Sequence, residues 1–277
     1  MIESLTVNDT TIALVELDKD HPGFRDATYR ARRNQIAAVA AGYRLGDPVP
    51  DIDYTALEHS VWRIARENLA PFHARYACHE YREGAVVVRL PDTDILQLRR
   101  TNELVAPASG FRFWPVAGLV SPRTFLTFLG RQVFLATQYI RHHSAPLYTP
   151  EPDVIHELVG HSPLLAHPDI AALHTLFGET ALRVPESRAD ALIRVYWYTM
   201  EFGLVMEGPS LRAIGAGLLS SYGEMERFER EAKIQPLDLD VVAATPFDTS
   251  SYQDTLFVAE SSEHMVSDLS RWLRNFR

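Results

Sequence analysis

The chain has 277 residues, of which 46% are hydrophobic, so it can bury a large core as one large domain or two small ones. Its formal net charge of −9 argues against nucleic acid or an anionic membrane as the main partner, so we expect a small-molecule ligand. Cys78 is the only cysteine, no stretch reaches about 18 apolar residues, and the N-terminus lacks a signal-peptide pattern, so a cytoplasmic protein without disulfides or thiolate metal sites is expected.

Residues 1–19 are expected to form an N-terminal extension, in which Thr11–Leu17 is a short strand or an extended tail. No linker-like stretch divides residues 20–277, which predicts one domain there. Helices are predicted at Tyr29–Tyr43 and Tyr54–His79, where apolar residues recur at helical spacing. Pro71 is interpreted as the first-turn restart of a second helix that runs to Tyr76. The basic residues of the first helix, Arg30, Arg32 and Arg33, are expected to form a solvated face.

The middle of the chain mixes strand and helix patterns. Gly84–Leu90 is predicted as a brief strand, Pro91–Arg99 as a short helix and Gly110–Gly118 as an extended segment. A helix should open at Ser121 and Pro122 as N-cap and first helical residue. Because apolar residues occupy most of its sides, we expect it to continue through 140 as a central core helix.

Residues 149–165 hold the most informative stretch of the chain, TPEPDVIHELVGHSPLL. Asp153 follows two prolines and stands where an N-cap is expected, while Gly160 is interpreted as the stop of a short helix. Residues five apart on a regular α-helix diverge by roughly 140°. His156 and His161 therefore converge only if the backbone breaks between them, and Gly160 is where we expect that break. Glu157 would then lie beside His156.

Glu201 is the second unusual feature, because it lies among aromatic and apolar residues of a helix predicted at Ala189–Met206. Burying a carboxylate is costly unless a cation or strong donors meet it. One interpretation is an ordinary ion pair with Arg141 or Arg194. The other is a metal ligand.

The last part of the chain contains a glycine- and serine-rich stretch at Gly215–Glu224 inside Leu211–Arg230. Its glycines allow close backbone approach and its serines offer donors to a polar ligand. An amphipathic helix is predicted at Ala259–Phe276, for packing against the core or for self-association.

Two histidines and one carboxylate suit an Fe(II) centre whose remaining coordination positions are open to oxygen and substrate chemistry. The same ligands also suit a zinc hydrolase that uses a metal-bound water as the nucleophile. Composition and spacing do not separate these two classes.

From Asp20 to about Glu260, the chain resembles the pterin-dependent aromatic amino acid hydroxylases, specifically the bacterial phenylalanine hydroxylases that consist of the catalytic domain. The resemblance is carried by six motifs in order, namely DHPGFRDATYRARR (Asp20–Arg33), GFRFWPVAGL (Gly110–Leu119), TQYIRH (Thr137–His142), YTPEPDVIHELVGH (Tyr148–His161), YWYTMEFGL (Tyr196–Leu204) and GAGLLSSYGE (Gly215–Glu224).

This resemblance implies a mainly α, single helical basket-like catalytic domain with a few short β-strands. It also implies a monooxygenase that uses Fe(II), a tetrahydropterin and O₂ to hydroxylate the ring of L-phenylalanine, at the para position. The metal ligands would be His156, His161 and Glu201. The pterin residues would be Gly118, Val120, Phe125 and Glu157. The amino acid would be bound by Arg141, oriented by Asp153, and by Thr149, Trp197, Phe202 and Ser220.

The sequence departs from the family pattern at three positions. Leu135 replaces a histidine on the pterin side, Thr124 replaces an acidic residue before the stacking Phe, and Asp254 replaces a proline. A phenylalanine meta-hydroxylase, or a hydroxylase of tyrosine or tryptophan, is therefore the alternative within the family. A zinc hydrolase and a family member that only binds an aromatic amino acid are the alternatives from other classes. We expect a monomer or small homo-oligomer.

Overall fold

Helices build most of the chain in the computed structural model, which describes residues 17–249 and 251–277. The α-helices are α1 (Ala27–Ala41), α2 (Ala56–Tyr76), α3 (His79–Val88), α4 (Leu98–Ser109), α5 (Pro122–Leu129), α6 (Ser162–Ala166), α7 (Pro168–Arg183), α8 (Ala189–Tyr196), α9 (Ala216–Ser220), α10 (Tyr222–Glu231), α11 (Leu239–Ala244) and α12 (Ser262–Asn275). Two π-helical segments, η1 (His156–His161) and η3 (Trp197–Glu201), and a 3₁₀ turn, η2 (Glu186–Arg188), complete the helical elements. The strand or tail predicted at Thr11–Leu17 lies, apart from its last residue, outside the described residues.

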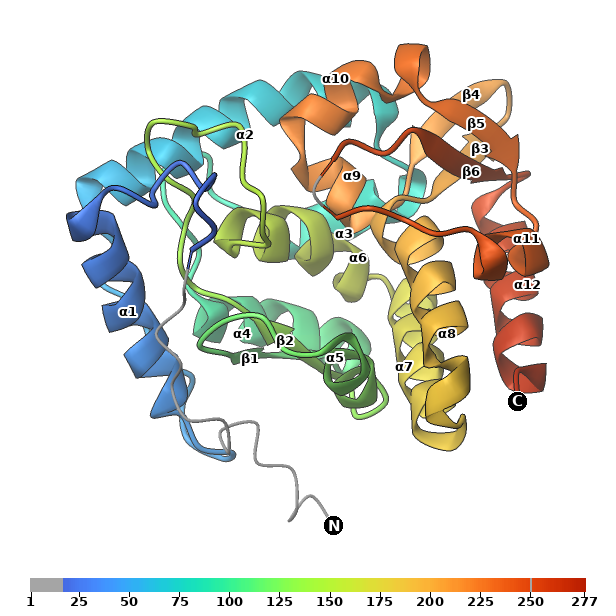
Figure 1. The fold of residues 1–277 in the computed structure, drawn as a ribbon, viewed down its shortest axis with the longest axis horizontal. Helices are drawn as coiled ribbons and strands as arrows, with labels where there is room; N and C mark the ends of the chain where they lie inside the picture. Colours follow the sequence, from blue (N-terminus) through green and yellow to red (C-terminus); the bar gives the residue numbers. More distant parts are fainter. Residues whose placement is uncertain (1–16, 250) are drawn as a thin grey trace.

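Most elements are helices and the strands are short, which confirms the mainly α prediction. Figure 1 shows α6 and α9 near the middle of the molecule, α2 and α10 above them, α1 at the left, and α7, α8 and α12 at the right. Among the described residues, none of the helices combines the length and apolar character that crossing a membrane requires.

Two small sheets flank the central helices. Strands β1 (Arg112–Pro115) and β2 (Val133–Ala136) pair in parallel, with Phe113 opposite Phe134. The second sheet has the order β4-β3-β6-β5, formed by β3 (Leu204–Glu207), β4 (Ser210–Ala213), β5 (Lys233–Pro236) and β6 (Thr255–Ala259). Strand β2 leads into the segment before η1, and β3 follows directly after η3. The sheets therefore fix the approach to one π-helical segment and the exit from the other.

Side-chain caps set several helix starts. Asp26 accepts hydrogen bonds from two backbone N–H groups at the start of α1, and Ser121 caps α5 with Pro122 at its first position, as predicted. At α2, Thr55 and Glu58 form a reciprocal capping box. These local bonds fix where the three helices begin, of which only the start of α5 was predicted with its cap.

Five element predictions were wrong, in whole or in part. The helix predicted at Ala189–Met206 ends at Glu201, and strand β3 begins at Leu204. Helix α2 continues through Pro71 without a restart. The valine-rich stretch predicted as a strand at Gly84–Leu90 belongs to helix α3, because its buried residues recur at helical spacing where α3 packs against α6. Residues 91–97 are irregular and α4 begins only at Leu98. The helix predicted to reach residue 140 ends at Leu129, and a strand, β2, follows.

The last of these errors has a clear physical cause. All four residues of β2 are buried, so the strand shows the continuous apolar run of a buried helix rather than an alternating pattern. Helix α5 ends at Leu129, and in the turn that leads to β2 Gln132 adopts a left-handed backbone conformation with φ of 57°, which a continuing helix does not allow. Apolar content alone does not distinguish the two structures.

The solvated face predicted for the first helix was wrong for Arg33. Its side chain is buried, forms an ion pair with Glu151 and stacks on the Tyr139 ring at 3.7 Å. Arg32 pairs with Glu58 across to α2. Helix α1 is thus anchored through two of the three arginines.

Replacing Gly178 by alanine should destabilise the fold. A Cβ atom there would lie 1.8 Å from the backbone nitrogen of Gly130, where α7 meets the end of α5. We expect Gly178→Ala to lower the free energy of unfolding by about 1–3 kcal/mol, as overpacking does. Urea unfolding followed by circular dichroism measures this. The control is Gly42→Ala, where a Cβ meets ordinary contacts at 3.5 Å and little change is expected; equal unfolding midpoints for both variants would contradict the prediction.

Candidate metal centre and active site

The two histidines of the HELVGH motif converge because their backbone is π-helical. The Nε2 atoms of His156 and His161 lie 3.0 Å apart. In a π-helix the hydrogen bonds join residues five apart, so such residues occupy one face as residues four apart do in an α-helix. The predicted break and stop at Gly160 were wrong, because the helix continues into α6. Gly160 instead gives close access to α9, since a Cβ there would lie 2.6 Å from the Ala216 oxygen.

Glu201, at the end of the second π-helical segment, meets both histidines. Its carboxylate oxygens lie 3.2 Å from Nε2 of His161 and 3.7 Å from Nε2 of His156. One ligand atom from each of the three residues lies within 4.8 Å of the other two, as a metal site requires. The alternative of an arginine partner was wrong. Arg141 pairs with Asp153, and Arg194 donates to the Ala243 carbonyl.

The electrostatics of the three residues suit a bound cation. Burial lowers the pKa of His156 to about 4 and that of His161 to about 3, so both imidazoles are held neutral, which is the form that binds metals. Burial raises the pKa of Glu201, and the nearby histidines oppose that shift. A divalent cation would stabilise the buried carboxylate. Two neutral imidazoles and one carboxylate are a donor set that fits Fe(II), and the same set is compatible with zinc.

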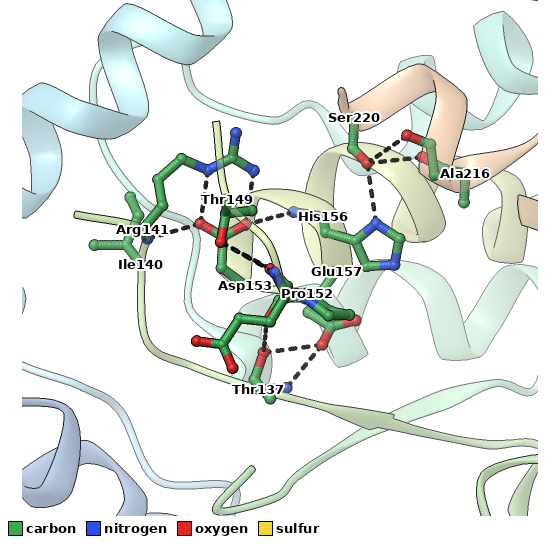
Figure 2. A network of polar contacts seen from close by, with 12 residues as sticks. Thr137, Ile140, Arg141, Thr149, Pro152, Asp153, His156, Glu157, Ala216 and Ser220 are labelled. Carbon is green, nitrogen blue, oxygen red and sulfur yellow. Dashed lines mark hydrogen bonds and ion pairs between the residues drawn. The ribbon is translucent and has the colours of Figure 1, made fainter. Parts of the chain in front are cut away.

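Ser220 fixes the orientation of His156. Its hydroxyl donates to the Ala216 carbonyl at 2.8 Å, so the same oxygen accepts from Nδ1 of His156 at 3.0 Å. With the proton on Nδ1, the lone pair of Nε2 points toward His161 and Glu201. Figure 2 shows this chain from α9 to the imidazole.

Arg141 and Asp153 form a buried bidentate ion pair, which Figure 2 shows beside the His156 backbone. Two guanidinium nitrogens, Nε and Nη2, donate to the two carboxylate oxygens at 2.9 and 2.8 Å. The backbone N–H of His156 also donates to Asp153, at 3.2 Å, as expected of an N-cap. Burial alone would raise the pKa of Asp153, but Arg141 and these hydrogen bonds hold it below its ordinary value.

The carboxyl group of Glu157 differs from that of Asp153 because its partner is a neutral residue, Thr137. Both the backbone N–H and the hydroxyl of Thr137 lie within hydrogen-bonding distance of its Oε1, at 3.0 and 2.9 Å. These bonds only partly offset burial, which raises the pKa of Glu157 to about 8. No cationic side chain pairs with it among the described residues.

The three candidate metal ligands, Arg141 and Glu157 line one cavity of about 630 Å³. Its lining includes every predicted site residue except Asp153, namely His156, His161, Glu201, Gly118, Val120, Phe125, Glu157, Arg141, Thr149, Trp197, Phe202 and Ser220. Asp153 contacts Arg141 from the side. Of the three departures, Leu135 lines the cavity, whereas Thr124 and Asp254 do not.

Aromatic rings hold the walls in place. Phe125 makes edge contacts with Phe134 and Tyr196, at centroid distances of 5.3 and 5.7 Å. Trp197 stacks on Phe247 at 4.4 Å, and its Nε1–H donates to Gln253 at 2.9 Å. These contacts fix the aromatic part of a cavity wall that also contains charged and polar residues.

A family model described as biopterin-dependent aromatic amino acid hydroxylase matches residues 4–277. The chain belongs to this family. It is 41% identical to "Tyrosine 3-monooxygenase" of Schistosoma mansoni over 93% of this chain, and 40% identical to "Phenylalanine-4-hydroxylase" of Bos taurus over 94%. The chain spans 57% and 58% of the lengths of these curated relatives.

Solved structures agree with this membership. The phenylalanine hydroxylase of Chromobacterium violaceum, with bound iron(III) and oxidised 7,8-dihydrobiopterin, matches with a TM-score of 0.76 and 27% identity. The match covers 89% of this chain and 92% of that one. Because phenylalanine and tyrosine hydroxylases match the chain almost equally, overall identity does not select the substrate.

Several residues around this hydroxylase-family site were not singled out from the sequence. Thr137 belongs to the motif TQYIRH, but the sequence assigns no role to its side chain, and none to that of Gln253. His174 lies behind His161, with ring centroids 6.3 Å apart. Nδ1 of His161 and Nε2 of His174 both lack a hydrogen-bond partner within residues 17–249 and 251–277. A single histidine on an apolar helix face gives no sequence signal that separates it from a core residue.

Removing the charge of Asp153 should destabilise the protein strongly. Asp153→Asn leaves the buried Arg141 guanidinium without an anion, and we expect a loss of about 3–5 kcal/mol of unfolding free energy. The matched control is Asp51→Asn, which breaks the exposed ion pair with Arg99 and should change stability far less. Urea denaturation of both variants measures the difference. A loss no larger than that of the control would show that Arg141 does not depend on this partner.

Proposed function

We propose that the chain is an iron- and tetrahydropterin-dependent monooxygenase that hydroxylates the aromatic ring of L-phenylalanine, at the para position, to give L-tyrosine. The observation that carries the proposal is the convergence of His156, His161 and Glu201 in the wall of a cavity that also contains Arg141. Family membership and the bound groups of the Chromobacterium relative support it.

In this proposal His156, His161 and Glu201 hold the iron. When bound, iron and the reduced pterin together supply the activation of O₂ that ring hydroxylation needs. The protein contributes two imidazoles that burial keeps neutral and one carboxylate, which leaves net positive charge at the ion. The Ser220 hydroxyl keeps Nε2 of His156 free for the metal.

The pterin would lie against Phe125, near Gly118, Val120 and Glu157. T-shaped contacts with Phe134 and Tyr196 hold the Phe125 ring in the cavity wall, where it would stack on a flat heterocycle. Burial favours the protonated form of the Glu157 carboxyl, which can both donate and accept a hydrogen bond. The apolar Leu135 supplies no polar contact on this side.

The amino acid would bind through its carboxylate to Arg141, whose orientation is fixed by Asp153. Thr149, Trp197, Phe202 and Ser220 would line the rest of its pocket. The Trp197 ring, held between Phe247 and Gln253, limits where the substrate ring can lie. The aromatic walls also exclude water from the reacting ring.

Residues 20–277 would form the catalytic domain and residues 1–19 an extension of it. A monomer or small homo-oligomer remains our expectation for the assembly.

The iron content of two variants should distinguish Glu201, the proposed iron ligand, from Glu157. We expect Glu201→Gln to lower iron affinity by at least ~10-fold, because losing a ligand should cost no less than losing a supporting contact. The matched variant Glu157→Gln should retain iron, since its carboxyl bonds to Thr137 rather than to the histidines. Iron per chain after loading with Fe(II) and desalting measures both. Equal iron in the Glu201 variant and the parent would remove Glu201 from the ligand set.

The activity test is oxygen uptake with each component omitted in turn. Uptake that requires Fe(II), tetrahydropterin and phenylalanine together supports the proposal, and parallel reactions with tyrosine and tryptophan compare the substrates. Zinc-dependent hydrolysis without oxygen uptake would overturn it. Phenylalanine binding without turnover would assign the chain a binding role.

The ring position is tested by chromatography against para-tyrosine and meta-tyrosine standards. We expect para-tyrosine, because Trp197 and Phe202 retain the aromatic pair of a phenylalanine-type pocket. The carbon that reacts is the one held at the oxidant, and misplacement of a reacting group by about 1 Å can change its rate about 100-fold. Leu135 lines the cavity at a position where the family has histidine, so meta-tyrosine is the alternative product. If it predominates, Leu135→His is the variant expected to restore the para product.

A further inference from the structure

A second group of metal-ligating side chains lies outside the cavity's metal centre. It consists of Asp26, His142 and His143, and one potential ligand atom from each lies within 4.8 Å of the other two. Asp26 precedes α1, and the two histidines belong to the loop that follows Arg141. None of the three lines the cavity.

Asp26 uses only one of its two carboxylate oxygens for helix capping. Its Oδ1 accepts the N-cap hydrogen bonds of α1 from the backbone N–H groups of Thr28 and Tyr29, at 2.9 and 3.0 Å. Its Oδ2 lies 3.3 Å from Nε2 of His142. The capping role of Asp26 thus occupies one oxygen and leaves the other facing the imidazole.

His142 is oriented as a supported ligand. Its side chain is buried, and Nδ1 lies 2.7 Å from the Ser144 hydroxyl. Metal-bound histidines in proteins usually have such a partner at the second ring nitrogen, which fixes the ring and its tautomer. In this structure the Ser144 backbone N–H also donates to Nδ1 at 3.3 Å, and Nε2 hydrogen-bonds to Oδ2 of Asp26 at 3.3 Å. A metal ion would replace the proton on Nε2, and Nδ1 would then carry the proton and donate it to the Ser144 hydroxyl oxygen.

His143 supplies the third group. It is exposed, its ring centroid lies 4.2 Å from that of His142, and neither of its ring nitrogens has a hydrogen-bond partner among the described residues. Ligand atoms around a tetrahedral ion with bonds of about 2.1 Å lie about 3.4 Å apart. The Asp26–His142 distance already has this value, so only the unrestrained His143 side chain has to move inward.

We propose that Asp26, His142 and His143 form a second, solvent-open binding site for a divalent transition-metal ion such as Zn²⁺. Two imidazoles and a carboxylate favour zinc and its neighbours over Mg²⁺ and Ca²⁺, which prefer all-oxygen sites. Because His143 is exposed and Asp26 is half-buried, water can fill the remaining coordination positions. The site is independent of the proposed hydroxylase activity.

The test is equilibrium dialysis of the iron-loaded protein against Zn²⁺, with zinc and iron per chain measured by mass spectrometry. We expect one zinc per chain in addition to the retained iron. His143→Ala and Asp26→Asn should each weaken this zinc binding by at least ~10-fold without changing iron content. Asparagine is as good an N-cap as aspartate, so the second variant keeps the start of α1.

A matched control uses a second histidine–carboxylate cluster, formed by His79, Glu83 and His167. His79 and His167 lie 3.1 and 3.3 Å from the two oxygens of Glu83, yet these three do not meet the distance condition of a metal site. His79→Ala should bind zinc as the parent does. Zinc should also raise the melting temperature of the parent but not of His143→Ala.

Three outcomes would overturn the proposal. Unchanged zinc affinity in His143→Ala would show that this residue is not a ligand. Loss of zinc in His79→Ala instead would place the ion at the other cluster. Zinc taken up only in exchange for iron would show that Asp26 and His142 form an ordinary ion pair. Because each result is a difference between variants, it does not depend on the ion that the cavity holds.

Discussion

The candidate metal centre depends on close backbone contact between α9 and the two π-helical segments. A Cβ at Gly160 would lie 2.6 Å from the backbone carbonyl oxygen of Ala216. A Cβ at Gly215 would lie 2.2 Å from the backbone carbonyl oxygen of Glu201. The start of α9 is therefore in contact with both η1 and η3, and larger side chains would separate them. The histidines and the glutamate are far apart in sequence, and this contact brings their side chains together.

Three carboxyl groups near the cavity are all buried but have different partners, and the partners decide their charge. Asp153 accepts from the Arg141 guanidinium and from two backbone N–H groups, those of Arg141 and His156, so its pKa is lowered. Glu157 has only Thr137, and burial raises its pKa to about 8. Glu201 faces two imidazoles that burial keeps neutral, and its pKa is raised as well. Asp153 is thus the carboxylate whose charge the protein itself balances, whereas Glu201 needs a cation from outside the chain.

That His156, His161 and Glu201 lie together could be predicted from the sequence, but the backbone geometry that brings them together could not. They stood out because histidines and a carboxylate in apolar surroundings are chemically conspicuous, and the family resemblance grouped them as a ligand set. Their convergence was attributed to a helix break, because sequence periodicity assumes α-helical spacing and contains no signal for a π-helix. The strand β2 and the helix α3 were misassigned for a related reason. In both, burial against neighbouring elements overrides the local pattern.

The role of α1 differs from the one that its arginines suggest. Three arginines in the first helix are typical of a solvated face, yet Arg33 is buried against Tyr139 and paired with Glu151. Elsewhere on α1, the Tyr29 hydroxyl donates to the Ile140 carbonyl at 2.9 Å.

The loop between β2 and η1 carries Arg141 and Asp153. The contacts with α1 hold this loop just before Arg141 and again just before Asp153. Asp26 reaches the same loop through His142. The position of the Arg141 guanidinium in the cavity therefore depends on α1, a helix that contributes no residue to the cavity wall. A change that loosens α1 should act on the Arg141 side of the cavity before it reaches His156, His161 and Glu201, because α9 packs against both η1 and η3 and holds those three residues.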